Sequence, residues 1–178
     1  MSTFPEPLGS ISTALTTINN NINKVITPNI NILDLSVLTQ IGSIVASLGV
    51  GGPLYPAINN ALAQAQKLGT TLSPADSTLL IQRLNNEVVQ SYGALLQALD
   101  TRKSQLGQVP TNGLLAGLVG ATNLLRGIFN NLNLSLTRQL ALNQALVKVL
   151  DPTLQAPGKA VTDAIQNLLK ISLDLYSV

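Results

Sequence analysis

The residues best suited to chemistry in this chain are its charged side chains, and they are few. Ten Lys and Arg and eight Asp and Glu amount to 10% of the 178 residues, against about 25% in an ordinary soluble domain. The densest group is Asp100, Arg102 and Lys103. A carboxylate beside two bases could orient the carboxylate or head group of a ligand. More often, such a trio is a solvated helix face.

The acidic residues are spread singly along the sequence, so no pair for general acid–base catalysis is evident. Two carboxylates that are distant in the sequence and brought together by the fold remain the one alternative for such catalysis. Six of the eight isolated carboxylates are those of Asp34, Asp76, Glu87, Asp100, Asp151 and Asp163. The chain has no His, Cys or Trp, which excludes Ser–His and Cys–His nucleophiles and thiolate or imidazole metal sites. We therefore predict a protein that is not an enzyme and has no cofactor and no metal.

The basic residues do not form a patch that would bind nucleic acid. The net charge is only +2, the bases are scattered, and aromatic residues make up 3% of the chain, whereas nucleic-acid binding needs clustered Lys and Arg, usually with aromatics for stacking. Neutral Asn, Gln, Ser and Thr supply the polarity instead. Such a surface can approach an uncharged apolar phase without desolvating many ions.

Apolar residues recur at helical spacing along almost the whole chain. After Ser10, a plausible N-cap, the first stripe has steps of four, three, four and three; its members are Ile11, Leu15, Ile18, Ile22 and Val25. No stretch alternates with a period of two. The sequence predicts an all-α fold, an antiparallel bundle of five to six amphipathic helices. Residues 1–9, with Pro5 and Pro7, are expected to form a flexible tail before a single domain at 10–178.

Punctuating residues divide this pattern into segments. Residues 49–52 (Gly-Val-Gly-Gly) separate a second helix from a third at about 53–68, and the sequence leaves open whether these form one helix or two. Gly69 is a helix stop. Ser73 and Pro74 begin a fourth helix of roughly thirty residues, to a break at 107–110. Its stripe is Leu80, Leu84, Val88, Tyr92, Leu95, Leu99 and Leu106.

The fifth helix, predicted from Thr111 or Asn112 to Leu150, is more apolar than a two-layer bundle requires. It is either buried on most sides or lines a ligand cavity. Each interior glycine costs about 1 kcal/mol relative to alanine, offset by close helix packing or by room for an acyl chain; these glycines are Gly113, Gly117, Gly120 and Gly127. The predicted ligand-lining residues are Leu95, Leu99, Leu118, Leu125 and Phe129. Residues 113–129 are too short and polar for a transmembrane segment.

A few further residues keep two interpretations. Tyr55, Tyr92 and Tyr176 suit either the mouth of a pocket or the edge of the core. Asn133 begins an Asn-Leu-Ser glycosylation sequon, which its helical setting makes a chance match. The first residues have no basic and apolar leader pattern, so we expect either a cytosolic protein or a mature secreted chain.

Short motifs along the chain resemble the fungal hydrophobic surface-binding protein A family, which includes the cell-wall galactomannoproteins. They are residues 72–77 (Leu-Ser-Pro-Ala-Asp-Ser), 96–103 with Arg102-Lys103 in place of a double Lys, and 105–111 with its Val-Pro-Thr turn. The Ile- and Asn-rich first helix and the Leu-Tyr-Ser end of the last helix also fit. The resemblance spans about residues 10–177. Residues 30–38 depart from the family in being longer and more apolar, as does the Gly-rich fifth helix.

This resemblance implies an extracellular or wall-associated helical domain without enzymatic activity. Some members adsorb to hydrophobic surfaces and recruit esterases, and others hold fatty acids in an apolar tunnel between helices. We therefore predict binding of a long-chain fatty acid or other lipid between helices. The alternatives are an interfacial protein that adsorbs to hydrophobic surfaces, and a wall protein with no small ligand. The oligomeric state is left open.

Overall fold

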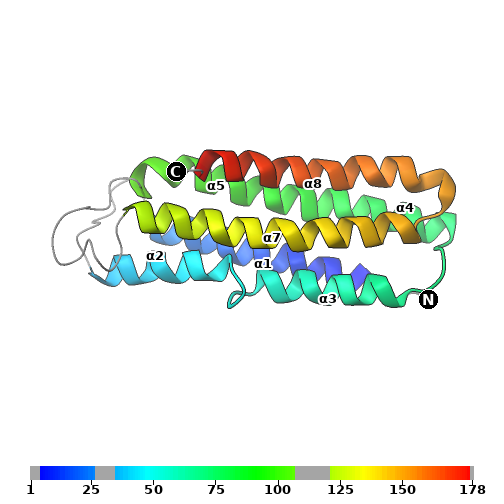
Figure 1. The fold of residues 1–178 in the computed structure, drawn as a ribbon, viewed down its shortest axis with the longest axis horizontal. Helices are drawn as coiled ribbons and strands as arrows, with labels where there is room; N and C mark the ends of the chain where they lie inside the picture. The colour runs from blue at the N-terminus through cyan, green and yellow to red at the C-terminus, as the bar shows by residue number, and fades with distance from the viewer. Residues whose placement is uncertain (1–4, 27–34, 107–120, 177–178) are drawn as a thin grey trace.

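The computed structural model describes residues 5–26, 35–106 and 121–176, and all of these except short connectors are helical (Figure 1). The helices are α1 (Pro5–Val25), α2 (Leu35–Ser47), α3 (Leu54–Lys67), α4 (Pro74–Arg83), α5 (Gln90–Leu106), α7 (Ala121–Val149) and α8 (Gln155–Tyr176). A π-helix, η1 (Leu84–Val89), joins α4 to α5, and a 3₁₀ turn, η2 (Pro152–Leu154), precedes α8. Counting α4, η1 and α5 as one helix, the described residues form six helices and no strand, which confirms the predicted fold class.

The helices form five parallel or antiparallel rods around a common core. Helices α2 and α3 lie end to end and make one rod, and α4, η1 and α5 make another (Figure 1). Each rod packs mainly against two neighbours, in the order α8, α7, α3, α1, α5 and back to α8. Rods that follow one another in sequence run antiparallel, whereas α1 and α5 lie side by side and run in the same direction. A ring of five rods leaves a central space that side chains have to fill.

The first helix begins earlier than predicted. It starts at Pro5, so residues 5–9 belong to the helix and not to the expected flexible tail at residues 1–9. The prediction that Ser10 caps this helix is therefore also wrong. Proline is tolerated at both Pro5 and Pro7, because the first N–H groups of a helix have no intrahelical partner. Leu8 is fully buried and extends the stripe of Ile11 by one turn. Burial of Leu8 thus favours a helix that includes both prolines.

The rod from α4 to α5 confirms its predicted start and its predicted stripe from Leu80 to Leu99. The Ser73 Oγ accepts a hydrogen bond from the N–H of Asp76 at 3.1 Å, with Pro74 at the first helical position. Leu80, Leu84 and Val88 are buried, as predicted. These residues recur at steps of four, which would drift around an α-helix with 3.6 residues per turn. The wider η1, built on i→i+5 bonds, keeps the stripe facing the core.

In α7 the centre of the buried face lies beside the lining residues that the sequence predicts. Its centre is a stripe at steps of three and four, formed by Ile128, Leu132, Ser135, Gln139, Leu142 and Leu146. The predicted lining residues Leu125 and Phe129 flank this stripe and are half-buried, as is Leu136. The difference arises because Ser135 and Gln139 are polar residues at core positions. The predicted start at Thr111 or Asn112, and Gly113, Gly117 and Gly120, lie outside the described residues.

Helices α2 and α3 are two helices, separated at residues 49–52, and α7 secures the junction. Asn131 Nδ2 donates to the Val45 carbonyl at 2.7 Å, and Ser135 Oγ donates to the Leu48 carbonyl at 3.0 Å. The Val45 carbonyl also accepts from the Leu48 N–H at 3.2 Å, whereas the Leu48 carbonyl lies just past the last residue of α2, where carbonyls lack i→i+4 partners. A Cβ on Gly49 would lie 2.5 Å from Asn131 Oδ1. At Gly127, a Cβ would lie 2.9 Å from Val45 Cγ1, so close packing of α7 on α2 accounts for this glycine.

Candidate ligand-binding core

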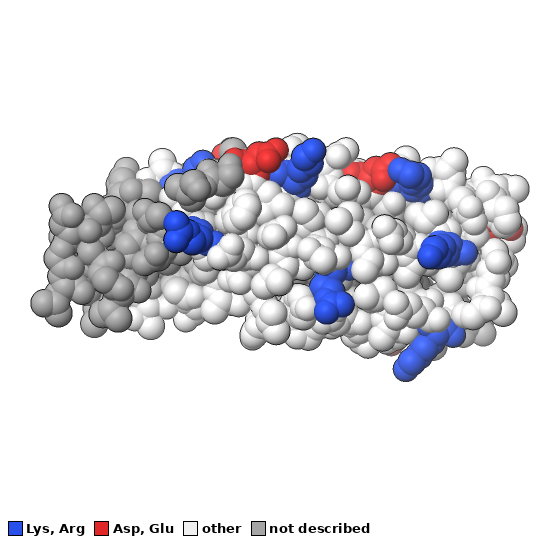
Figure 2. Space-filling model, viewed as in Figure 1, with Lys and Arg blue, Asp and Glu red and all other residues white. Residues whose placement is uncertain are grey.

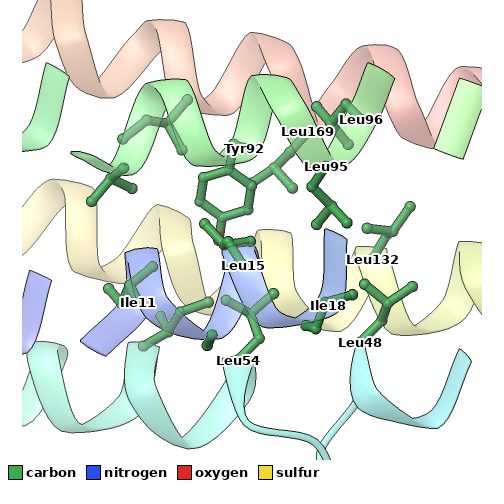
Figure 3. Close-up of a cluster of buried hydrophobic side chains, with 14 of the residues drawn as sticks. Ile11, Leu15, Ile18, Leu48, Leu54, Tyr92, Leu95, Leu96, Leu132 and Leu169 are labelled. Atoms are coloured by element: carbon green, nitrogen blue, oxygen red, sulfur yellow. The ribbon is translucent and has the colours of Figure 1, made fainter. Parts of the chain in front are cut away.

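A column of aliphatic side chains fills the space between the five rods. Figure 3 shows it at mid-length, where residues from every rod meet around the ring of Tyr92. The labelled members include Leu15 and Ile18 of α1, Leu54 of α3, Leu95 of α5, Leu132 of α7 and Leu169 of α8, all fully buried. The column is uncharged along the described residues, and Leu and Ile dominate it. It is therefore an environment for the apolar part of a ligand.

The structure divides the five predicted ligand-lining residues into three groups. Leu95 and Leu99 of α5 are 0% and 1% exposed and belong to the central column. Leu125 and Phe129 of α7 are half-buried and pack against that column from one side. Leu118 lies outside the described residues. The role of all five in ligand binding stays a prediction.

A chain of neutral polar side chains crosses the core from one rod to the next. Tyr92 OH donates to Gln139 Oε1 at 3.1 Å, and Gln139 Nε2 donates to Asn143 Oδ1 at 2.8 Å. Asn143 Nδ2 then donates to the Thr162 carbonyl at 3.0 Å. Tyr92 and Gln139 are fully buried, and Asn143 is 5% exposed. This polar chain joins α5, α7 and α8 and places hydroxyl and amide donors inside an otherwise apolar column.

Sequence reasoning found Tyr92 but missed its partners. Gln139 and Asn143 are four residues apart, so they lie on one face of α7, and Gln139 occupies a position of the buried stripe. Two polar residues at helical spacing among leucines were therefore the sequence feature that indicates this buried polar chain. Only the pairing with Tyr92, which is 47 residues away from Gln139, could not be read from the sequence.

The other candidates lie elsewhere. Asp100 is exposed, and Lys103 Nζ lies 5.7 Å over the ring of Tyr176. The Tyr176 hydroxyl is buried and donates to the Leu99 carbonyl at 2.7 Å. The trio Asp100, Arg102 and Lys103 thus begins more than two helical turns beyond Tyr92. Asn133 of the sequon is exposed in the middle of α7.

Burial raises the pKa of both Tyr92 and Tyr176 well above the usual value for tyrosine. In the unfolded chain both phenols ionise near pH 10, while in the folded protein they keep their protons. The unfolded state therefore binds fewer protons above pH 10, and we expect the free energy of unfolding to fall there by about 1.4 kcal/mol per pH unit for each tyrosine.

Thermal or urea unfolding between pH 8 and pH 11.5 checks this expectation. Tyr92→Phe should remove about half of the slope. Tyr55→Phe is the control, because a hydrogen bond from Arg138 Nε lowers the pKa of Tyr55 instead. A slope that is unchanged in Tyr92→Phe would contradict the assignment.

Two grooves run beside the C-terminal part of α7. One, of about 360 Å³, lies between α7 and α8. The other, of about 470 Å³, lies between α3 and α7. Gln144 and Lys148 line both. On the face where α7 and α8 lie in front, Lys and Arg side chains stand apart on a largely uncharged surface (Figure 2).

The described residues hold no cluster of three or more Asp or Glu residues that could bind a metal ion. None of their helices is both long and apolar enough to cross a membrane.

The fold is shared with fungal ligand-binding proteins. No protein-family model matches the chain, and no curated protein matches it in sequence. Among solved structures, AfMP4p in complex with palmitic acid is similar, with a TM-score of 0.73, 20% identity and 98% of both chains covered.

Ligand binding domain 2 of Penicillium marneffei MP1, complexed with arachidonic acids, has a TM-score of 0.72 at 16% identity, over 98% of this chain and 94% of that one. Domain 1 of the same protein, also complexed with arachidonic acids, has a TM-score of 0.64 at 14% identity, over 96% and 97%. Over nearly its whole length, this chain has the fold of these domains.

Proposed function

We propose that this protein binds a long-chain fatty acid, or a lipid of similar shape, between its helices and performs no catalysis. The observation that carries the proposal is the uncharged apolar column inside the ring of rods, with the polar chain from Tyr92 to Asn143 in it. Similar structures were solved with palmitic and arachidonic acids, which supports a ligand of this class. The hydroxyl of Tyr92 and the amides of Gln139 and Asn143 are neutral donors for a carboxylate.

The energetics favour a long chain. Burial contributes about 0.8 kcal/mol per CH₂, so about fifteen methylenes contribute about 12 kcal/mol. Association costs from about 4 to 15 kcal/mol, to which the opening of the core adds. Leu15, Leu95 and Leu132 occupy the column in this structure, so these side chains and the rods must shift to admit the ligand. About 8 kcal/mol remains when the association cost is near the lower end of its range, which corresponds to micromolar affinity as the upper limit for a chain of sixteen carbons.

The fold and the sequence motifs also support a family and a location for the protein. We infer that it is an extracellular or wall-associated member of the hydrophobic surface-binding protein A and galactomannoprotein group. The Ser73-Pro74 helix start and the fold shared with fungal domains support this. The small number of charges on its surface supports the second candidate, adsorption to hydrophobic surfaces.

Native mass spectrometry of the purified protein, before and after delipidation, tests the proposed function. We expect a co-purifying lipid near one-to-one, and after delipidation a saturable shift with palmitic and arachidonic acids. At a ligand concentration one hundred times Kd, the complex should be stabilised by about 2.7 kcal/mol, which thermal unfolding will detect. A mass that stays free of ligand with both acids would refute the proposal and leave surface adsorption or a purely structural role.

A further inference from the structure

The groove between α7 and α8 reaches the polar chain from outside the protein. Asn143 and Thr162, which are 5% and 4% exposed, form part of its lining. Both residues also belong to the hydrogen-bonded path that ends at Tyr92 in the core. A hydrogen-bonded chain of neutral groups thus leads from the lining of the groove through Asn143 and Gln139 to the fully buried hydroxyl of Tyr92.

The charges around this groove favour an anion. Lys159 Nζ pairs with Asp163 Oδ2 at 2.6 Å, so the charges of these two residues cancel. Lys148, which is exposed, forms no ion pair within the residues that the structure describes. The lining therefore carries one net positive charge, which matches the single negative charge of a carboxylate. Leu140 and Val147 in the same lining offer an apolar surface to the first methylenes of an acyl chain.

The neighbouring groove between α3 and α7 has the same lysine but no connection to the polar chain. It shares Lys148 and Gln144, and its other lining residues include three alanines and the polar residues Gln66, Thr70 and Thr71, none of which belongs to the polar chain. A carboxylate held there would have no member of the polar chain to move to. The two grooves therefore form a natural pair for comparison.

We propose that the groove between α7 and α8 is the site where a fatty-acid carboxylate first binds and the route by which it reaches the core. Lys148 attracts the carboxylate, and the amide N–H of Asn143 donates a hydrogen bond to it in the groove. The carboxylate then moves from Asn143 toward Gln139 and Tyr92. This inference rests on the proposed fatty-acid binding. It adds the place of uptake and the residue that selects an acid over an uncharged lipid.

Two tryptophan variants test the route. Gln166 of α8 lines only the first groove and Gln66 of α3 only the second, and both are exposed. Stopped-flow fluorescence of parinaric acid, excited directly, gives the association and dissociation rate constants. Gln166→Trp should lower both rate constants together by at least tenfold, because a bulky ring in the route raises the barrier in both directions. Gln66→Trp should change them less than twofold.

A charge variant tests the selectivity independently of the bulky ring. Lys148→Gln removes an exposed charge and should slow association of parinaric acid three- to tenfold at low salt, and not that of its methyl ester. Equal rates in Gln166→Trp and Gln66→Trp, or equal effects of Lys148→Gln on acid and ester, would overturn the uptake route. Failure of the unmodified protein to bind either probe would instead refute the proposed function, so the two failures can be distinguished.

Discussion

Replacing Gln139 with alanine is expected to lower the free energy of unfolding by about 4 kcal/mol. Gln139 is fully buried and forms two hydrogen bonds, one with Tyr92 OH and one with Asn143 Oδ1. The substitution leaves both partners buried without this bond, at about 1–3 kcal/mol for each group. The lost methylenes also leave a cavity that the surrounding helices can only partly close.

Urea unfolding of Gln139→Ala, with Gln144→Ala as the matched control, measures this effect. Gln144 lies on the same helix but is exposed, so its substitution should change stability by less than about 0.5 kcal/mol. Tyr92→Phe should cost less in the Gln139→Ala background than alone, because its partner is already gone. If Gln139→Ala cost no more than Gln144→Ala, the polar chain would not exist as described.

Gly52→Ala is expected to be destabilising by about 3 kcal/mol. A Cβ at Gly52 would overlap the carbonyl oxygen and the Cα of Ser47, and a backbone carbonyl cannot move aside as the end of a side chain can. Relief requires the junction of α2 and α3 to open, which disturbs the bonds from Asn131 and Ser135. Overpacking of this kind costs about 1–3 kcal/mol, and the junction bonds add to it.

Gly51→Ala is the control, because a Cβ at Gly51 meets nothing within 4 Å. Its φ is not in the left-handed region, so alanine should be neutral or slightly stabilising through the unfolded state. Differential scanning calorimetry on both variants makes the comparison. Equal melting temperatures for the two would contradict the tight junction between α2 and α3.

Most of the helices could be predicted from the sequence because their signals are local. The spacing of Leu80, Leu84 and Val88 requires only that one face be apolar, and the cap at Ser73 requires only residues three positions away. The same local reasoning failed at Pro5, where burial of Leu8 extended the helix through two prolines. It also did not identify Ser135 and Gln139 as core positions of α7, because both residues are polar.

The sequence predicted the apolar type of the ligand-lining residues but not which of them lie at the centre of the core. Apolar spacing placed Leu95 and Leu99 on a buried face, and they lie in the central column. Leu125 and Phe129 lie at its side, because the rotation of α7 about its axis depends on which partners satisfy Gln139 and Ser135. Those partners come from other rods and are distant in the sequence.

The sequence by itself determined the all-helical fold, the absence of His and Cys chemistry, and the low charge that suits an apolar ligand. These properties follow from composition and from repeats of three and four residues. The tertiary structure alone decided that five rods close into a ring and that Tyr92, Gln139 and Asn143 form one chain. It alone placed at the end of that chain a groove containing Lys148, which has no ion pair among the described residues. Contacts between rods depend on the packing of whole helix faces, and no local repeat encodes which faces meet.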